Sequence, residues 1–188
     1  PFLVQIGGLG ADAVWAWFSG TDAIRFIKAY DEYGLRGKLP LLGSQTLVDD
    51  IILPNMGDLA RDIINVGQYS VTLDTPENRA FVKDFEARYN AWPNIYSEGG
   101  YASGLLIGAA IEALKGELGD RAKFREALRT VAPKIRAPRG PIQFDRYQQV
   151  ITSIYIMKVE RQGNRLVNVI LDTIPNTSQE ESWKWWNK

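Results

Sequence analysis

The sequence predicts an α/β fold, because short apolar segments alternate with amphipathic segments of helical period along residues 11–70. Residues 13–18 form an almost unbroken apolar run that ends before Gly20, and this pattern predicts a buried strand. Residues 38–43 and 64–69 predict two more strands. Strand–helix–strand units of this kind build a parallel sheet that helices cover on both faces.

The first amphipathic helices are indicated by apolar periodicity and by the residues at their ends. Residues 21–33 predict a helix with Thr21 as its N-cap. Its apolar face, spaced by three and four positions, consists of Ala23, Phe26, Ile27 and Tyr30. Residues 75–89 predict a second helix, in which Thr75 is the cap and Pro76 the first helical residue.

Beyond residue 89 the sequence predicts two more helices and then β-structure. Residues 97–115, which are rich in glycine and alanine, and residues 120–131 predict two more helices. Residues 150–160 and 165–174 are apolar runs joined by a turn at Gly163, so they predict a β-hairpin.

Both ends of the chain are also expected to be helical. Residues 2–6 are expected to close a helix that ends at the glycine pair that follows. Residues 177–188 contain three tryptophans and predict a packed terminal helix. Trp15 and Trp17 lie inside the first predicted strand, so we expect them to pack in the core.

The composition excludes several classes of function. The 188 residues include 22 Lys and Arg against 22 Asp and Glu, so no excess of basic charge indicates a nucleic-acid partner. The sequence contains no His and no Cys, which excludes disulfides, thiolate metal sites and His-based triads. We assign no catalytic residue, no metal ligand and no cofactor. Enzyme chemistry on Asp, Glu, Lys or Tyr is the third-ranked alternative.

Small polar residues follow two neighbouring predicted strands at their carboxyl ends. Residues 18–21 (FSGT) follow the first strand and residues 43–46 (GSQT) follow the second. Ligands of open α/β sheets bind at such strand ends, where hydroxyls, main-chain N–H groups and a helix dipole suit a carboxylate. Capping by Ser or Thr explains either loop alone. Two adjacent loops of the same chemistry favour a binding site.

Three segments resemble a known family. These are "ADAVWAWFSGTDAIRFIKAYDEYGLRGKLPLLGS", "YSEGGYASGLLIGAAIEAL" and "PRGPIQFD" with the hairpin that follows. They resemble the Leu/Ile/Val-binding family, the periplasmic substrate-binding proteins of ABC importers. The resemblance covers essentially the whole chain and is most specific in "RGPIQFD".

The resemblance implies a type I periplasmic-binding-protein fold, in which hinge strands join two three-layer α/β/α lobes. Members of the family are much longer, so this chain resembles their C-terminal half. Residues 1–72 would form part of the second lobe and residues 73–148 part of the first. Residues 149–188 would supply a hinge strand, the second-lobe hairpin and the C-terminal helix.

The resemblance also implies ligand-binding positions. The expected set is Phe18, Ser19, Gly20, Gln45, Thr46 and Tyr96. Gln45 lies where amino-acid receptors of the family keep a glutamate that pairs with the ligand's ammonium group. A neutral amide cannot compensate a buried ammonium. We therefore expect a small aromatic or branched carboxylate that is not an α-amino acid, flanked by Phe18 and Tyr96.

Two alternatives keep this fold. One is branched-chain amino-acid binding, and the other is the effector-sensing domain of a regulator or receptor. The expected partners are a small-molecule ligand, the ABC permease in the membrane and the missing N-terminal half of the same protein. The expected location is periplasmic, or extracellular and lipid-anchored, with the export signal outside this fragment.

Overall fold

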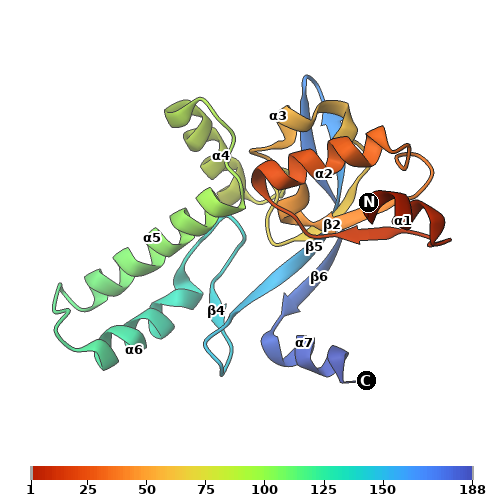
Figure 1. Cartoon of the computed structure of the whole chain (residues 1–188). Helices are drawn as coiled ribbons and strands as arrows, with labels where there is room; N and C mark the ends of the chain where they lie inside the picture. The colour runs from red at the N-terminus through yellow and green to blue at the C-terminus, as the bar shows by residue number, and fades with distance from the viewer. Residues whose placement is uncertain (1, 188) are drawn as a thin grey trace. The chain divides into compact units, whose positions relative to one another are not determined.

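The computed structural model describes residues 2–187 (Figure 1). In chain order the elements are α1 (Phe2–Gly8), β1 (Val14–Ala16), α2 (Gly20–Glu32), β2 (Leu41–Ser44), η1 (Gln45–Val48), α3 (Leu53–Met56), η2 (Gly57–Ala60), β3 (Ile64–Gly67), α4 (Pro76–Tyr89), α5 (Ile95–Ala113), α6 (Arg121–Val131), η3 (Ala132–Lys134), β4 (Gln143–Phe144), β5 (Val150–Gln162), β6 (Arg165–Thr177) and α7 (Gln179–Trp186). This mixture of helices and strands confirms the α/β prediction. Among the described residues, none of the helices has both the length and the apolar character needed to span a bilayer.

The chain divides into two compact units. The first comprises Pro1–Thr72 and Tyr155–Thr173, and the second comprises Leu73–Ile154 and Ile174–Lys188. The chain therefore passes between the units three times, after Thr72, Ile154 and Thr173. The assignment of these units to the lobes of a complete receptor stays a prediction.

The first unit contains a mixed sheet. Strands β1 and β2 pair in parallel, with Val14 opposite Leu41, and β2 pairs in parallel with β3. Strand β3 pairs antiparallel with β5, where Gly67 lies opposite Tyr155, and β6 pairs with β5. The carboxyl ends of β1, β2 and β3 consequently lie side by side at the same end of the sheet, where α/β proteins place their ligands.

Helices pack on this sheet through its apolar side chains. Helix α2 contributes Ala23, Ile27 and Tyr30 to the core, and it lies beside β1 and β2 in Figure 1. Leu47 and Val48 of η1 and Leu53 of α3 are also buried in this core. These contacts fix the direction in which the chain leaves β1 and β2.

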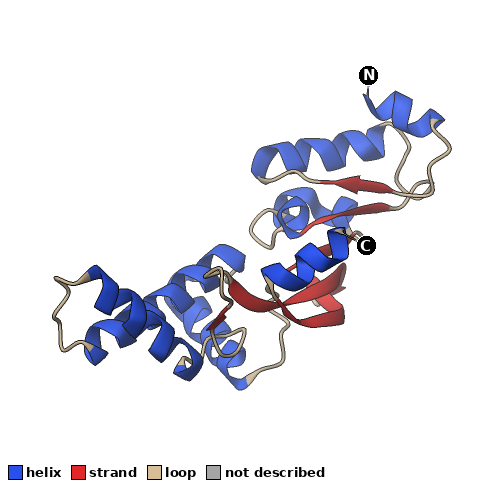
Figure 2. Ribbon diagram, turned by 90° about the horizontal axis from the view of Figure 1, so that it is seen from below, coloured by secondary structure: helices blue, strands red, loops and turns tan. Residues whose placement is uncertain are grey.

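The second unit is mainly helical, as the colouring in Figure 2 shows. Helix α4 begins as predicted, because the Thr75 side chain accepts a hydrogen bond from the N–H of Asn78. Phe81 of α4 stacks on Tyr101 of α5 with ring centroids 4.7 Å apart. Helices α5 and α6 pack against each other.

Helix α2 begins one residue earlier than predicted. Its N-cap is Ser19, two residues before the predicted cap Thr21, because the helix already includes Gly20. Gly20 has a φ of +55°, a value that glycine adopts without the steric cost that other residues incur. The polar loop after β1 is therefore one residue shorter than the sequence indicated.

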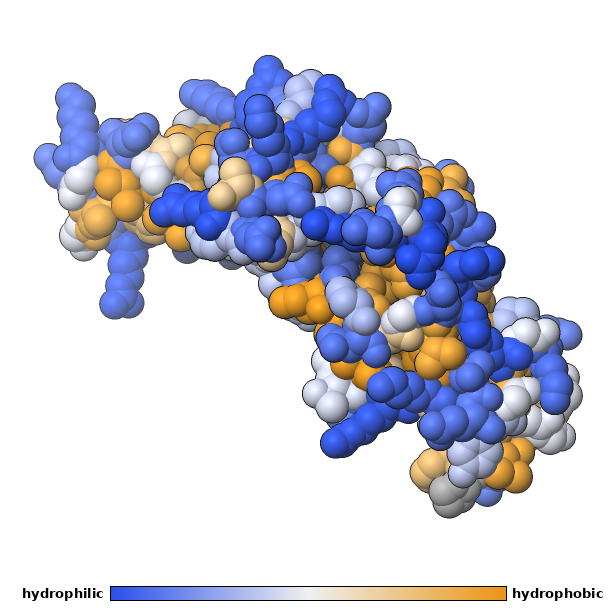
Figure 3. All heavy atoms as spheres, turned by 90° about the horizontal axis from the view of Figure 1, so that it is seen from above, coloured by the Kyte–Doolittle hydropathy of each residue, from blue (hydrophilic) through white to orange (hydrophobic). Residues whose placement is uncertain are grey.

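The predicted burial of the tryptophans is wrong for the described residues. Trp15 is 59% exposed and Trp17 is 76% exposed. Strand β1 lies at an edge of the sheet, so part of its side-chain surface meets no other element of the described chain. Separate apolar areas are also visible on the face of the molecule shown in Figure 3.

The C-terminal helix also differs from the prediction. Trp183, Trp185 and Trp186 of α7 are all more than two-thirds exposed, so the helix is not packed as expected. Helix α7 belongs to the second of the two compact units. The N–H of Gln179 donates to Asp145 at 3.2 Å, and this bond holds the start of α7 to that unit.

Candidate functional site

The loop after β1 presents an aromatic ring and a hydroxyl at the start of α2. Phe18 is 41% exposed and stacks on Phe26, with ring centroids 4.7 Å apart. Ser19 is exposed, and its side chain makes no capping hydrogen bond to α2 within the described structure. The Ser19 hydroxyl therefore lies beside the first N–H groups of a 13-residue helix.

The loop after β2 is tied to the loop after β1. The hydroxyl of Thr46 donates to the carbonyl oxygen of Phe18 at 3.0 Å and lies 2.8 Å from the hydroxyl of Ser44. A Cβ on Gly43 would lie 2.8 Å from the carbonyl oxygen of Ala16, so the two strands require glycine there. The structure therefore brings Phe18, Ser19, Gly20 and Thr46 together.

Gln45 has a different environment. Its side chain is only 3% exposed. Its Oε1 accepts from the N–H of Gln68 at 3.0 Å, and its Nε2 donates to the carbonyl oxygen of Tyr69 at 2.5 Å. These bonds join the end of β2 to the chain that leaves β3. As a ligand contact, Gln45 stays a prediction.

Tyr96 lies in the second unit, so its position relative to the strand-end loops of the first is not described. It is 63% exposed and occupies the second position of α5. The Asn94 side chain accepts from the N–H of Ser97, and the Ser97 hydroxyl accepts from the N–H of Asn94. This capping box fixes the start of α5 and therefore the backbone of Tyr96.

Asn168 is a buried polar residue that the sequence reasoning missed. Its Nδ2 donates to the carbonyl oxygen of Val48 at 3.0 Å and to Asp50 Oδ1 at 3.1 Å. Its Oδ1 accepts from Asn65 at 2.8 Å. The available signal was a single amide within the apolar run "RLVNVIL".

Asp50 is an acidic group within this network. Burial, and next the neighbouring carboxylate of Asp49, raise the pKa of the Asp50 carboxyl to about 7 against the opposing effect of the bond from Asn168. The network thus holds an acid that is partly protonated at neutral pH. It lies in the first unit with the strand-end loops.

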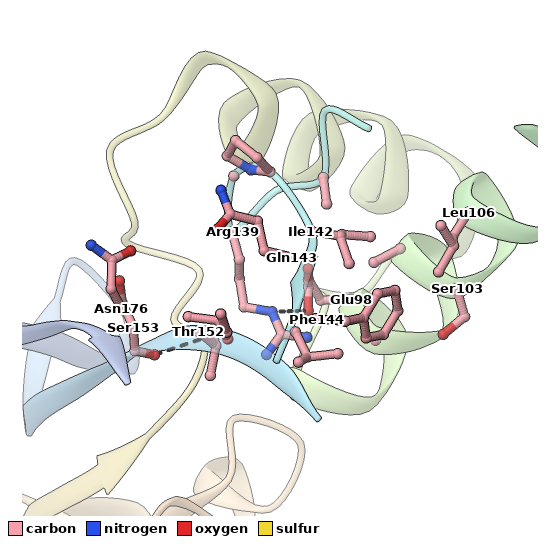
Figure 4. A pocket seen from close by; sticks show the side chains of 17 residues that line it. Glu98, Ser103, Leu106, Arg139, Ile142, Gln143, Phe144, Thr152, Ser153 and Asn176 are labelled. Carbon is pink, nitrogen blue, oxygen red and sulfur yellow. Dashed lines mark hydrogen bonds and ion pairs between the residues drawn. The ribbon is translucent and has the colours of Figure 1, made fainter. Parts of the chain in front are cut away.

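A separate pocket of about 490 Å³ lies in the second unit (Figure 4). Glu98 is fully buried at its wall, and its Oε2 lies 2.7 Å from Nε of Arg139. Burial raises the pKa of Glu98, although the Arg139 guanidinium opposes that effect. Neither residue was singled out from the sequence, because their pairing joins positions 41 apart.

The strand-end loops offer hydrogen-bond donors and an apolar ring to a ligand. The residues that line them, from Phe18 to Gly20 and from Ser44 to Thr46, carry no ionisable side chain. Hydroxyls and main-chain N–H groups bind anions by hydrogen bonds, and a helix N-terminus favours negative charge. The arrangement suits a small ligand with a carboxylate and an apolar body.

Comparison with known proteins assigns this architecture. The chain matches the family described as periplasmic binding protein over residues 1–164. It is 32% identical to Leu/Ile/Val-binding protein homolog 6 of Brucella melitensis over 166 residues, which cover 86% of this chain and 42% of that protein. The chain thus spans less than half the length of the curated relatives it matches.

Solved structures of substrate-binding and solute-binding proteins are also similar to this chain. An ABC transporter substrate-binding protein from Sphaerobacter thermophilus is 35% identical, with a TM-score of 0.86 over 94% of this chain and 48% of that one. A solute binding protein from R. palustris in complex with benzoate is 31% identical, with a TM-score of 0.84 over 96% of this chain and 48% of that one. Another, from Rhodopseudomonas palustris BisB5, is 26% identical, has a TM-score of 0.86 over 97% of this chain and 50% of that one, and holds 3,4-dihydroxybenzoic acid.

Proposed function

Because this chain belongs to the periplasmic binding protein family, we propose that the complete protein is the solute-binding component of an ABC importer and captures a small aromatic carboxylate. The observation that supports this ligand class most strongly is the likeness to a solute binding protein in complex with benzoate, which extends over 96% of the chain. The fold with its strand-end loops supports the role in binding.

The chemistry of the loops supports a carboxylate ligand. The hydroxyl of Ser19 and the N–H groups at the start of α2 are donors for a carboxylate, whereas the hydroxyl of Thr46, which donates to Phe18, fixes the two loops together. Phe18 offers an exposed ring for an apolar or aromatic body. Tyr96 is the proposed contact from the second unit, since its ring is exposed at the start of α5.

The second candidate ligand is a branched-chain amino acid, which the name of the Brucella relative suggests. Such a ligand carries an ammonium group in addition to its carboxylate. The residues of the two strand-end loops carry no negative charge that would pair with it. An unpaired, desolvated ammonium costs several kcal/mol, so we place this candidate second.

The proposed partners follow from the same family role. They are the membrane permease of the importer and the N-terminal portion that the longer relatives possess. The proposed location is the periplasm. In the complete protein, residues 1–72 and the hairpin would belong to one lobe and residues 73–148 to the other, with the ligand enclosed by hinge closure.

A calorimetric titration of the full-length protein tests the ligand class. Benzoate is expected to bind, and leucine is expected to produce no saturable heat. The variant Phe18→Ala is expected to weaken benzoate binding by roughly tenfold or more, because it removes the ring contact. Tight binding of leucine with no binding of benzoate would contradict the proposal.

A further inference from the structure

The chain that leaves β3 is held by side chains and not by strand pairing. Strand β3 ends at Gly67, and the first of the two segments that make up the first unit ends at Thr72. Residues 68–72 therefore form the whole connection from the sheet to the first passage between the units; we call them the β3 exit. Tyr69 and Ser70 within this connection are fully buried.

Gln45 holds the first part of the β3 exit. Its amide accepts from the N–H of Gln68 and donates to the carbonyl oxygen of Tyr69, so it satisfies the main chain as a paired strand would. A Cβ on Gly67 would lie 1.9 Å from Oε1 of Gln45. Glycine at that position leaves the space that the Gln45 amide occupies.

Asn168 holds the second part of the β3 exit. The hydroxyls of Ser70 and Thr72 both donate to the main-chain carbonyl oxygen of Asn168. The Asn168 side chain is fixed in turn by Val48, Asp50 and Asn65. Asn168 lies on β6, which itself passes to the second unit after Thr173.

We propose that Gln45 and Asn168 form an amide clamp on the β3 exit and that Gln45 is a positioning residue, which couples the strand-end loops to the first passage between the units. Gln45 lies between Ser44 and Thr46, whose hydroxyls bond to each other, and Thr46 also bonds to Phe18. A movement of these loops on ligand binding is transmitted through the Gln45 amide to Gln68 and Tyr69. The coupling to a ligand rests on the proposed function, whereas the clamp itself does not.

The two atoms of the Gln45 amide have opposite roles, and this makes the clamp specific for glutamine. Methionine keeps the length and apolar volume of the side chain but removes both hydrogen bonds. Glutamate keeps an acceptor for the Gln68 N–H but places a second oxygen against the Tyr69 carbonyl oxygen. Neither replacement supplies the donor that the buried carbonyl of Tyr69 uses.

Hydrogen–deuterium exchange on the ligand-free, full-length protein tests the clamp. In Gln45→Met, amides of residues 64–72 are expected to exchange roughly tenfold faster than in the wild type. Ser70→Ala, which removes a hydroxyl that donates to the main-chain carbonyl oxygen of Asn168, is expected to have the same local effect. Asp120→Ala is the matched control, because it removes the N-cap bonds to Ala122 and Lys123 in the other unit.

The result that would overturn the clamp is unchanged exchange over residues 64–72, or an increase no larger there than in the rest of the protein. If Gln45→Met does not fold, Gln45→Glu carries the same comparison, since it preserves side-chain size and one of the two bonds. In either variant the control must leave residues 64–72 as protected as in the wild type.

Benzoate provides the second arm of the experiment. In the wild type, benzoate is expected to slow exchange in residues 18–20, 44–46 and 68–72. In Gly67→Ala, whose Cβ displaces the Gln45 amide without altering either loop sequence, protection of residues 18–20 is expected to persist while protection of residues 68–72 is lost. Equal protection of residues 68–72 in both proteins would refute the coupling. Failure of benzoate to protect any segment would refute the proposed ligand and leave the ligand-free test of the clamp decisive.

Discussion

Replacement of Gly67 by alanine is expected to destabilise the protein through Gln45. The new Cβ would lie 1.9 Å from Oε1 and 2.5 Å from Cβ of Gln45, so the amide must leave its position. Both of its hydrogen bonds, from the N–H of Gln68 and to the carbonyl oxygen of Tyr69, are then lost. With about 1–2 kcal/mol for each lost bond to a buried group, the expected loss is roughly 2–4 kcal/mol.

A double-mutant cycle isolates this cause. Gln45→Ala alone is expected to cost a similar amount, because it removes the same two bonds. Gly67→Ala added to Gln45→Ala is expected to cost less than Gly67→Ala costs in the wild type, since the clash with the amide is gone and only the contact with Cβ of residue 45 remains. The free energies of unfolding are measured by urea denaturation of the full-length protein.

Gly104→Ala serves as the control for a glycine without such a neighbour. A Cβ at Gly104 meets no atom within 4 Å in the described structure, and the residue lies inside α5. Alanine there is expected to stabilise the helix by roughly 0.5–1 kcal/mol. Additive effects of the Gly67 and Gln45 substitutions would refute the account of the β3 exit.

Two further predictions concern buried charges. Asp50, whose pKa burial raises to about 7, ionises in the unfolded chain near its ordinary value, so its stabilising effect is complete at low pH and is lost as the pH rises through 7. Between pH 5 and pH 8, the free energy of unfolding of Asp50→Asn is expected to fall by roughly 1–3 kcal/mol less than that of the wild type. The same pH dependence in both proteins would contradict this prediction. Arg139→Met leaves Glu98 buried without its cation and is expected to cost about 3–5 kcal/mol. The free energy of unfolding, measured by urea denaturation, is expected to recover in part at low pH, where Glu98 is protonated. A loss below about 1 kcal/mol at neutral pH would contradict a stabilising role for the ion pair.

The elements of the fold were predictable because their signals are local. Apolar period and end residues placed the longer helices and the strands of the sheet but missed α3, and the Thr75 cap was confirmed in detail. The start of α2 was misplaced, because Ser19 and Thr21 are both good N-cap residues and only the backbone decides between them. Terminal residues are the least certain part of such a prediction.

The burial of Trp15 and Trp17 was not predictable from their own segment. An apolar strand looks alike whether both of its faces are covered or only one. In the structure β1 is the edge strand, so its tryptophans remain exposed within the described chain. The apolar pattern of residues 13–18 therefore predicted the strand but not which of its faces is covered.

The environment of Gln45 depends on long-range pairing, which one sequence does not reveal. Spacing placed Gln45 at a strand end, and the resemblance suggested a ligand contact. Its observed partners, Gln68 and Tyr69, are 23 and 24 residues away, and the Asn65–Asn168 bond spans 103 residues. By contrast, the contact between the loops of Phe18 and Thr46 follows from the rule that neighbouring parallel strands have their carboxyl ends side by side.

A crystal structure of the full-length protein grown with benzoate tests the central claim most directly. We expect the carboxylate within hydrogen-bond distance of Ser19 or Thr46, or of the N–H groups that open α2, and the ring against Phe18. Benzoate bound away from residues 18–20 and 44–46, or a site there filled by leucine with its ammonium group paired to an acidic residue, would contradict it.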